Sequence, residues 1–324
     1  MDSEIKRVGV IGVGHLGQHH ARVYTELIDT RLVGVVDTDE SRAHAIGEHL
    51  GVPFYTDIDD MIERQRPDAL SIVVPTSLHY SVAKNALERG IHVLIEKPVT
   101  TRPSEAEELL SIAAEEDLVL QVGHIERFNS AVRHISQTVK NPLYLESKRI
   151  GPFSPRINDV GVVLDLMIHD IDIILSLVSS EISRIAATGR CIHTDHEDIA
   201  TTQITFENGT MANILVSRIS EKRMRQLDIM ERERHITVNY ETQDVQIQRC
   251  IRENNGTSVT EILEHPVFPK SEPLKLELAH FISCVREKRQ PLVGIRDGKR
   301  ALEVAVEVLR QIHSDAPQFR IHCA

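Results

Sequence analysis

Residues 7–17 read Arg-Val-Gly-Val-Ile-Gly-Val-Gly-His-Leu-Gly, in which an apolar strand pattern passes directly into a glycine-rich turn. The turn has the form Gly-x-Gly-x-x-Gly and lies between the first predicted strand and the first predicted helix, the context in which this motif binds a dinucleotide. Gly12 permits the tight turn, Gly14 lets the backbone approach a pyrophosphate, and Gly17 lets the helix pack on the strand. The N–H groups at the helix N-terminus are then available to the phosphates. The predicted site consists of Gly12, Gly14, His15, Leu16 and Gly17.

A carboxylate at the end of the second predicted strand extends this site. Asp37 lies 20 residues beyond Gly17, where a carboxylate accepts hydrogen bonds from the ribose hydroxyls of adenosine. The same carboxylate would repel the 2′-phosphate of NADP. We therefore expect NAD as the cofactor, with NADP as the less favoured alternative. Arg42 is close to Asp37 in the sequence, and its positive charge would weaken the preference for NAD over NADP. The alternative interpretation of Arg42 is a solvated charge on a helix.

The pattern of apolar and polar residues changes near the middle of the chain. Up to about residue 122, apolar β-branched runs alternate with helical patterns, which predicts βαβ units and a parallel sheet with helices on both faces. After Asn141-Pro142, long polar-apolar alternations predict a mostly antiparallel sheet, interrupted by one helix over 162–178 and closed by two more. We expect an α/β fold with an NAD-binding Rossmann domain over 1–122. An α+β domain over 123–324 would bind substrate and form oligomers, with its C-terminal helices packing back toward the first domain.

Composition excludes several classes of protein. The 48 acidic residues outnumber the 37 basic ones, and the formal net charge of −11 repels a nucleic-acid backbone. With 7 Phe, 5 Tyr and no Trp, a groove of stacking rings for nucleic acid is also not expected. The four cysteines are far apart in the sequence, and we interpret them as reduced thiols. No signal peptide or membrane span is visible, so we expect a cytoplasmic protein with no membrane partner.

A second motif, Glu96-Lys97-Pro98, ends a predicted strand. Together with the glycine turn, residues 74–79, Asp165 with His169, and residues 298–303, it makes the chain resemble the glucose-fructose oxidoreductase and inositol dehydrogenase (Gfo/Idh/MocA) family along nearly its whole length. The resemblance implies an NAD(P)-dependent oxidoreductase with a sugar or cyclitol substrate between two domains, and a Lys-Pro bond that is often cis. It adds to the expected cofactor-binding residues Thr76, His79, Glu96 and Lys97.

Lys97 is the first of the candidate catalytic residues. It stands at the carboxyl end of a central strand, where open α/β sheets place their ligands. A lysine there can donate hydrogen bonds to a substrate oxygen and stabilise developing negative charge. An isolated lysine would more often be a surface side chain, but the surrounding motif favours the catalytic interpretation.

The predicted helix over 162–178 carries the other candidates. Asp165, His169 and Asp172 are spaced i, i+4 and i+7, so they share one stripe and Asp165 comes within reach of His169. A histidine oriented by an aspartate is a suitable general base. The pair could instead bind a divalent metal, but no third ligand has convincing spacing, so we expect no metal. We interpret Asp170 as a member of an ordinary ion pair on the helix surface.

Three segments narrow the resemblance. Residues 124–129, 148–156 and 165–172 are similar to those of bacterial UDP-N-acetylglucosamine 3-dehydrogenases, which act before an aminotransferase on the route to a diamino-sugar lipid A. Ser130 replaces a proline that the broad family usually has, and Met167 stands where that family commonly has glycine. The substrate-binding residues expected from this likeness are Arg127, Asn129, Lys148, Arg149, Arg156, Asp165 and His169.

Charge gives modest support for a nucleotide sugar, because a diphosphate needs local cations in an acidic protein. The expected domain offers Lys148, Arg149, Arg156, Arg218, Arg223 and Arg225. Solvation of one sheet face explains any single one of them equally well.

Two other functions remain open. One is a dehydrogenase of a free sugar or inositol, and the other is a non-catalytic NAD-binding redox regulator. A regulator has no need of Lys97, Asp165 and His169 together. An open sheet usually pairs with another, so we also expect a homodimer or homotetramer.

Overall fold

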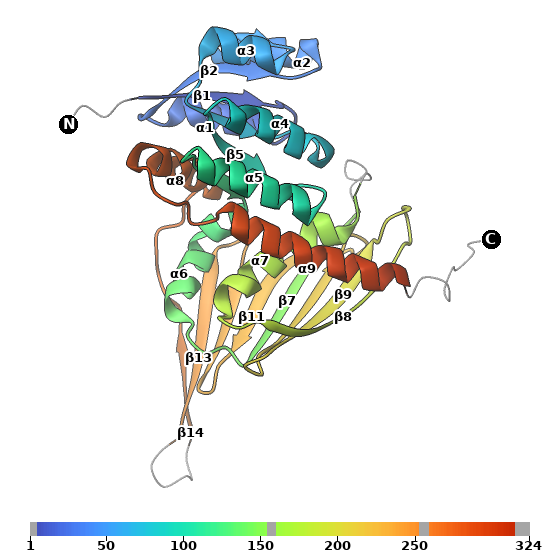
Figure 1. The fold of residues 1–324 in the computed structure, drawn as a ribbon. Coiled ribbons are helices and arrows are strands. Elements are labelled where there is room, and N and C mark those ends of the chain that lie inside the picture. Colours follow the sequence, from blue (N-terminus) through green and yellow to red (C-terminus); the bar gives the residue numbers. More distant parts are fainter. Residues whose placement is uncertain (1–4, 154–159, 253–258, 315–324) are drawn as a thin grey trace. The chain divides into compact units, whose positions relative to one another are not determined.

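The computed structural model describes residues 5–153, 160–252 and 259–314, and the chain forms two compact units (Figure 1). The first, which we call the Rossmann unit, runs up to Phe128 and includes Ser271–Leu302. The second, the sheet unit, comprises Asn129–Lys270 and the residues from Glu303 onward. Arg156, one of the expected substrate-binding residues, lies outside the described residues.

The Rossmann unit contains a six-stranded sheet in the order β3-β2-β1-β4-β5-β6, and every neighbouring pair is parallel. Its strands are β1 (Lys6–Ile11), β2 (Thr30–Val36), β3 (Phe54–Tyr55), β4 (Ala69–Ile72), β5 (His92–Glu96) and β6 (Leu120–Gly123). The strand order reverses between β1 and β4, the position at which such sheets bind ligands beyond the carboxyl ends of their strands. The expected parallel, doubly covered sheet is confirmed.

Helices of this unit bury the apolar runs of the strands. They are α1 (Gly17–Glu26), α2 (Glu40–Leu50), α3 (Ile58–Gln65), α4 (Thr76–Glu88), α5 (Pro103–Glu115), the short 3₁₀ helix η1 (Ile125–Phe128) and α8 (Pro273–Glu287). Although α8 is distant in the sequence, its Leu278 and Phe281 join the core that contains Val8 of β1 and Tyr24 of α1. Parallel strands buried on both faces are nearly continuous in apolar residues, which explains why β1 and β5 were visible in the sequence.

The sheet unit contains an eight-stranded sheet in the order β14-β13-β12-β11-β7-β10-β9-β8. Its strands are β7 (Tyr144–Ile150), β8 (Ile182–Arg190), β9 (Ile199–Phe206), β10 (Met211–Ser217), β11 (Met224–Met230), β12 (Arg234–Asn239), β13 (Asp244–Arg252) and β14 (Val259–Glu264). All neighbours are antiparallel except β7 and β10, which run parallel. The predicted mostly antiparallel sheet is confirmed.

Helices α6 (Ser130–Thr138) and α7 (Ile168–Leu177) belong to the same unit, and α9 (Ile295–Ser314) contains the boundary between the units (Figure 1). Side chains of β7 alternate between the two faces of the sheet: Leu145, Ser147 and Arg149 are buried on the face that α7 covers. Within the described residues, no helix is long and apolar enough to cross a bilayer.

Four elements differ from the sequence-based expectation. The pattern missed β3, which has only two residues, and α6, which is short. It also missed β14, an edge strand whose residues 261–263 are all exposed, so that no alternation marks it. The predicted helix over 162–178 begins as a π-helical turn, η2 (Val163–Met167), before α7 continues it.

Candidate cofactor and substrate sites

The glycine turn after β1 has the geometry that a dinucleotide requires. Gly12 has φ +84°, a conformation that favours glycine. A Cβ on Gly17 would lie 1.8 Å from the carbonyl oxygen of Gly12, so the start of α1 can approach the turn only because Gly17 has no side chain. A Cβ on Gly14 would meet no atom within 4 Å, which leaves open space beside the backbone there. Around this turn His15 is exposed and Leu16 half-buried. The turn therefore fits a pyrophosphate.

Asp37 follows β2 at the same edge of the sheet and is 7% exposed. Its Oδ2 accepts the N–H of Val13 at 3.0 Å, and its Oδ1 accepts the N–H of Asp39 at 3.0 Å. The Nη1 of Arg42 lies 3.1 Å from Oδ1 and 3.2 Å from Oδ2. Arg42 is thus not merely a solvated helix charge, since it pairs with the carboxylate that we expect to select the cofactor.

This pair gives a prediction about cofactor choice. Asp37→Ala is expected to narrow the preference for NAD over NADP about tenfold or more, because the carboxylate that repels a 2′-phosphate is removed and Arg42 then pairs with the exposed Asp39 and no longer with Asp37. Calorimetric titration with each cofactor measures the ratio of the two dissociation constants. The double variant Asp37→Ala/Arg42→Gln is the control, and it should lose the gain in NADP affinity. Tighter binding of NADP than NAD by the unmodified protein would contradict the assignment.

The Glu-Lys-Pro motif ends β5 at the carboxyl edge of the sheet. Lys97 is half-buried and the Lys97–Pro98 bond is cis, as the resemblance implied. Helix α4 begins at Thr76 and carries His79. The imidazole of His79 connects the Glu-Lys-Pro motif to the segment after β4. The Nδ1 of His79 lies 2.8 Å from the carbonyl oxygen of Pro98, and its Nε2 lies 2.9 Å from that of Val74. Burial lowers the pKa of His79, and the hydrogen bonds with the carbonyl oxygens of Pro98 and Val74 oppose this shift. The ring thus connects the backbone on both sides of the turn.

Behind Lys97 lies a buried polar network that the sequence analysis missed. The Oε1 of Glu96 lies 3.3 Å from Nε2 of His20, and its Oε2 accepts the N–H of Lys97 at 3.2 Å. The Nδ1 of His20 is 3.2 Å from the hydroxyl of Ser71, which is 2.9 Å from that of Tyr24. Burial opposes ionisation of Glu96, but His20 and then Lys97 hold the pKa of Glu96 below its ordinary value. The Glu96 carboxylate therefore faces the interior and holds the backbone at Lys97; its expected contact with the cofactor stays a prediction.

Glu277 on α8 is a second buried acid next to this network. It has no exposed surface, and burial followed by the charge of Glu96 raises the pKa of Glu277 well above its ordinary value. Both effects favour the neutral form of this carboxyl group. A sequence signal existed, because Glu277 interrupts the apolar stripe of Leu274, Leu278 and Phe281 on α8.

In the sheet unit, Asp165 lies in the π-helical turn and His169 in the first turn of α7, and both are half-buried. The start of this turn is held by Glu197, whose Oε1 accepts the N–H of Val163 at 3.0 Å. A Cβ on Gly161 would lie 1.9 Å from that Oε1, so the close approach needs glycine. Single π-helical turns frequently mark functional sites.

The interpretation of Asp170 as a member of an ion pair on the helix surface is wrong. It is completely buried, and Arg149 binds it with Nε 2.9 Å from Oδ2 and Nη2 3.2 Å from Oδ1. The hydroxyl of Ser147 donates to the same carboxylate at 2.8 Å, and the guanidinium lies 5.0 Å from the ring centroid of Tyr240. The pair is buried because this side of α7 packs against the sheet, which the helical periodicity alone did not reveal.

A second buried ion pair supports the loop before β9. The Nε of Arg218 lies 2.6 Å from Oδ1 of Asp198, and its Nη1 donates to the carbonyl oxygen of Val160 at 2.9 Å. Burial raises the pKa of Asp198, but hydrogen bonds from the N–H groups of His193 and Ile192 and from Arg218 outweigh it and lower that pKa to about 2. Asp198 was not recognised in the sequence.

These groups surround a pocket of about 160 Å³ within the sheet unit. Its lining consists of Arg149, Ile150, Gly151, Pro152, Asp165, Leu166, Ser217, Arg218, Arg223 and Arg225. The structure therefore brings Asp165 together with four of the cations expected to serve a diphosphate.

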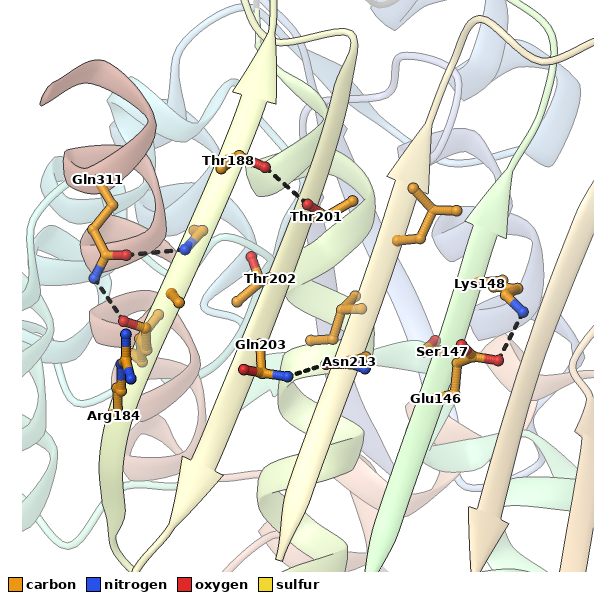
Figure 2. Close-up of a pocket in the computed structure, with 15 residues that line it drawn as sticks. Glu146, Ser147, Lys148, Arg184, Thr188, Thr201, Thr202, Gln203, Asn213 and Gln311 are labelled. Atoms are coloured by element: carbon orange, nitrogen blue, oxygen red, sulfur yellow. Dashed lines mark hydrogen bonds and ion pairs between the residues drawn. The ribbon is translucent and has the colours of Figure 1, made fainter. Parts of the chain in front are cut away.

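Lys148 is separated from this pocket. Its Nζ pairs with Glu146 at 2.7 Å on the opposite face of the sheet, where Figure 2 shows both side chains in a larger pocket of about 590 Å³. The amide of Asn129 is used inside the sheet unit: its Nδ2 donates to the carbonyl oxygen of Tyr240 at 2.9 Å and its Oδ1 accepts the N–H of Ala131 at 3.0 Å.

Arg127 belongs to the Rossmann unit, where its Nη2 lies 3.8 Å from Asp297. The substrate-binding roles of all these residues stay predictions. Among the residues that the structure describes, no three His, Cys, Asp or Glu side chains are grouped to hold a metal ion.

Comparison with known proteins adds independent findings. Residues 6–124 match the GFO/IDH/MocA model described as an oxidoreductase family with an NAD-binding Rossmann fold, and residues 126–239 match the GFO/IDH/MocA C-terminal domain. The chain is 36% identical over 306 residues to UDP-N-acetylglucosamine 3-dehydrogenase of Acidithiobacillus ferrooxidans, covering 93% of this chain and 96% of that protein. A solved structure of that enzyme, GnnA, has a TM-score of 0.89 at 34% identity and covers 95% of this chain and 98% of its own. The scyllo-inositol 2-dehydrogenase (NAD(+)) of Bacillus subtilis is 28% identical, over 96% of this chain and 95% of its own.

Proposed function

The chain belongs to the Gfo/Idh/MocA family of NAD-binding oxidoreductases and is a sugar dehydrogenase, and from this premise we propose that it oxidises the 3-hydroxyl of UDP-N-acetylglucosamine to a ketone. The observation that carries the proposal is the pocket in which Asp165 is surrounded by arginines. Arg149 and Arg218 are paired with buried carboxylates, and the two exposed arginines, Arg223 and Arg225, suit a diphosphate better than a neutral polyol. The likeness over nearly the whole chain to a dehydrogenase of this nucleotide sugar supports it further.

The chemistry divides between the two units. NAD, when bound by Gly12, Gly14 and Asp37, supplies the acceptor for the hydride that leaves the substrate carbon. His169 removes the hydroxyl proton as general base, and Asp165 orients the imidazole. Lys97 donates a hydrogen bond to the substrate oxygen as it becomes a carbonyl. A hydride and a proton are thus removed together from one secondary alcohol.

The test is whether turnover depends on the uridine diphosphate. Binding energy from this remote part of the substrate positions the reacting hydroxyl, so we expect kcat/KM for free N-acetylglucosamine to be lower by at least about a hundredfold than for the nucleotide sugar. Added salt should weaken activity on the nucleotide sugar and leave activity on a free sugar unchanged. NAD reduction is measured with a coupled aminotransferase, because oxidation of a secondary alcohol is unfavourable near neutral pH.

The second candidate is a dehydrogenase of inositol or a free sugar, which the inositol dehydrogenases among the relatives favour. If myo-inositol or glucose outperforms every UDP-sugar in the same assay, the nucleotide-sugar assignment is wrong and this candidate replaces it. A non-catalytic redox regulator would reduce no NAD with any of these substrates.

The other expectations from the sequence are part of this proposal. The ketone would be the substrate of an aminotransferase on the route to a diamino-sugar lipid A, and the cytoplasm would be the site of the reaction.

A homodimer or homotetramer would form through the open face of the large sheet. Exposed methionines on that unit support an interface there, because Met211 of β10 and Met230 of β11 both neighbour Tyr144 of β7 in register.

A further inference from the structure

The four arginines of the pocket around Asp165 divide into a buried pair and an exposed pair. Arg149 and Arg218 have side-chain exposures of 3% and 8%, and each is bound to a carboxylate that is completely buried, Asp170 and Asp198 respectively. Replacing either would leave a buried charge without its partner. These two arginines therefore build the wall of the pocket, and their charges are compensated within the fold.

Arg223 and Arg225 are in a different position. Their side chains are 64% and 41% exposed, and the Nε of each lies 3.9 Å from the same oxygen, Oε1 of Glu241. One carboxylate thus lies near two guanidinium groups, and both of these side chains present surface to solvent. An exposed ion pair at this distance contributes little stability, so a better anion can replace Glu241 with little loss.

The backbone places this pair at the mouth of the pocket. Arg225 lies opposite Arg149 in the register of β11 and β7, on the face of the sheet that carries Asp170 and α7. Gly151, which follows β7, lines the same pocket, and a Cβ there would meet no atom within 4 Å, which leaves its backbone accessible to a ligand. The volume of about 160 Å³ is smaller than the roughly 300–1,000 Å³ of pockets that enclose a whole ligand. The pocket therefore suits one part of a ligand.

We infer that Arg223 and Arg225 bind the diphosphate of the substrate, with each guanidinium donating paired hydrogen bonds to phosphate oxygens in place of Glu241. This inference rests on the proposed function, because it assigns the diphosphate of that substrate to two named side chains. Diphosphate held beside Asp165 brings the attached sugar to the helix that also carries His169. The two arginines then determine specificity, since a free sugar offers them nothing to bind.

The experiment uses the full-length protein and two probes, UDP and NAD, because both contain a diphosphate. Arg223→Gln and Arg225→Gln are each expected to raise the dissociation constant of UDP about tenfold, the scale of one lost charge-assisted contact, and to reduce its dependence on salt. Binding of NAD should not change in either variant, because the glycine turn belongs to the Rossmann unit. Arg225→Lys keeps the charge but loses the planar fork, and we expect it to recover only part of the affinity.

Arg232→Gln is the matched control. It removes an exposed arginine from the turn after β11, outside the pocket, and is expected to leave UDP affinity and its salt dependence unchanged. If the unmodified protein binds UDP and the double variant Arg223→Gln/Arg225→Gln binds it equally well, the inference is overturned while the proposed function stands. If the unmodified protein binds no UDP and oxidises only free sugars, the proposed function is overturned, and this inference with it.

Discussion

His169→Ala is expected to lower the rate of NAD reduction in a single turnover by about a hundredfold or more, the usual consequence of losing a general base. The imidazole is half-buried in the first turn of α7. It lies about one helical turn after Asp165, which lines the pocket together with the arginines. Alanine removes the proton acceptor without filling the space, so added imidazole should restore part of the rate. Rapid-mixing measurements of NADH absorbance with the nucleotide sugar in excess provide the value.

His235→Ala provides the control for this variant, because it removes a partly exposed imidazole from β12 of the same unit, outside the pocket. It should keep the unmodified rate. NAD affinity of His169→Ala should also be unchanged, since none of the residues expected to bind the adenosine or the pyrophosphate lies in the sheet unit. A near-normal single-turnover rate would mean that another side chain takes the proton.

Lys97→Ala is expected to reduce kcat by about a hundredfold to a thousandfold, the range seen when a donor that stabilises a developing oxyanion is removed. Lys97 follows β5 at the carboxyl edge of the parallel sheet, and the buried Glu96 holds its backbone N–H. The loss should appear in kcat and kcat/KM alike, because the hydrogen bond strengthens as the oxygen gains charge. Steady-state kinetics with the coupled assay separates the two constants.

Lys84→Ala is the corresponding control, since this lysine lies on α4 of the same unit and pairs with Glu108 at 2.6 Å on the surface. Its activity and NAD affinity should match those of the unmodified protein. An increase in KM alone for Lys97→Ala would show that the lysine binds ground state and transition state equally, which would remove it from the chemical step.

Local sequence was sufficient for the features that depend on neighbours along the chain. The turn from Gly12 to Gly17 follows from the conformations and contact distances that only glycine permits. The cis Lys97–Pro98 bond was expected from the resemblance to the family. The apolar runs of the parallel strands were equally visible, because strands covered by helices on both faces contain few polar residues. The strand order and the partner of each strand are not contained in such runs.

The tertiary structure alone decided which charges are paired inside the molecule. Asp170 and Arg149 are 21 residues apart, and Asp198 and Arg218 are 20 apart. Periodicity predicts which residues share a face of a helix or strand, but it does not show what that face meets. Burial then determines the role of each charge, because a buried ion must have a partner whereas an exposed one can exchange its partner for a ligand. For this reason four similar arginines in the sequence became two structural residues and two candidates for binding a diphosphate.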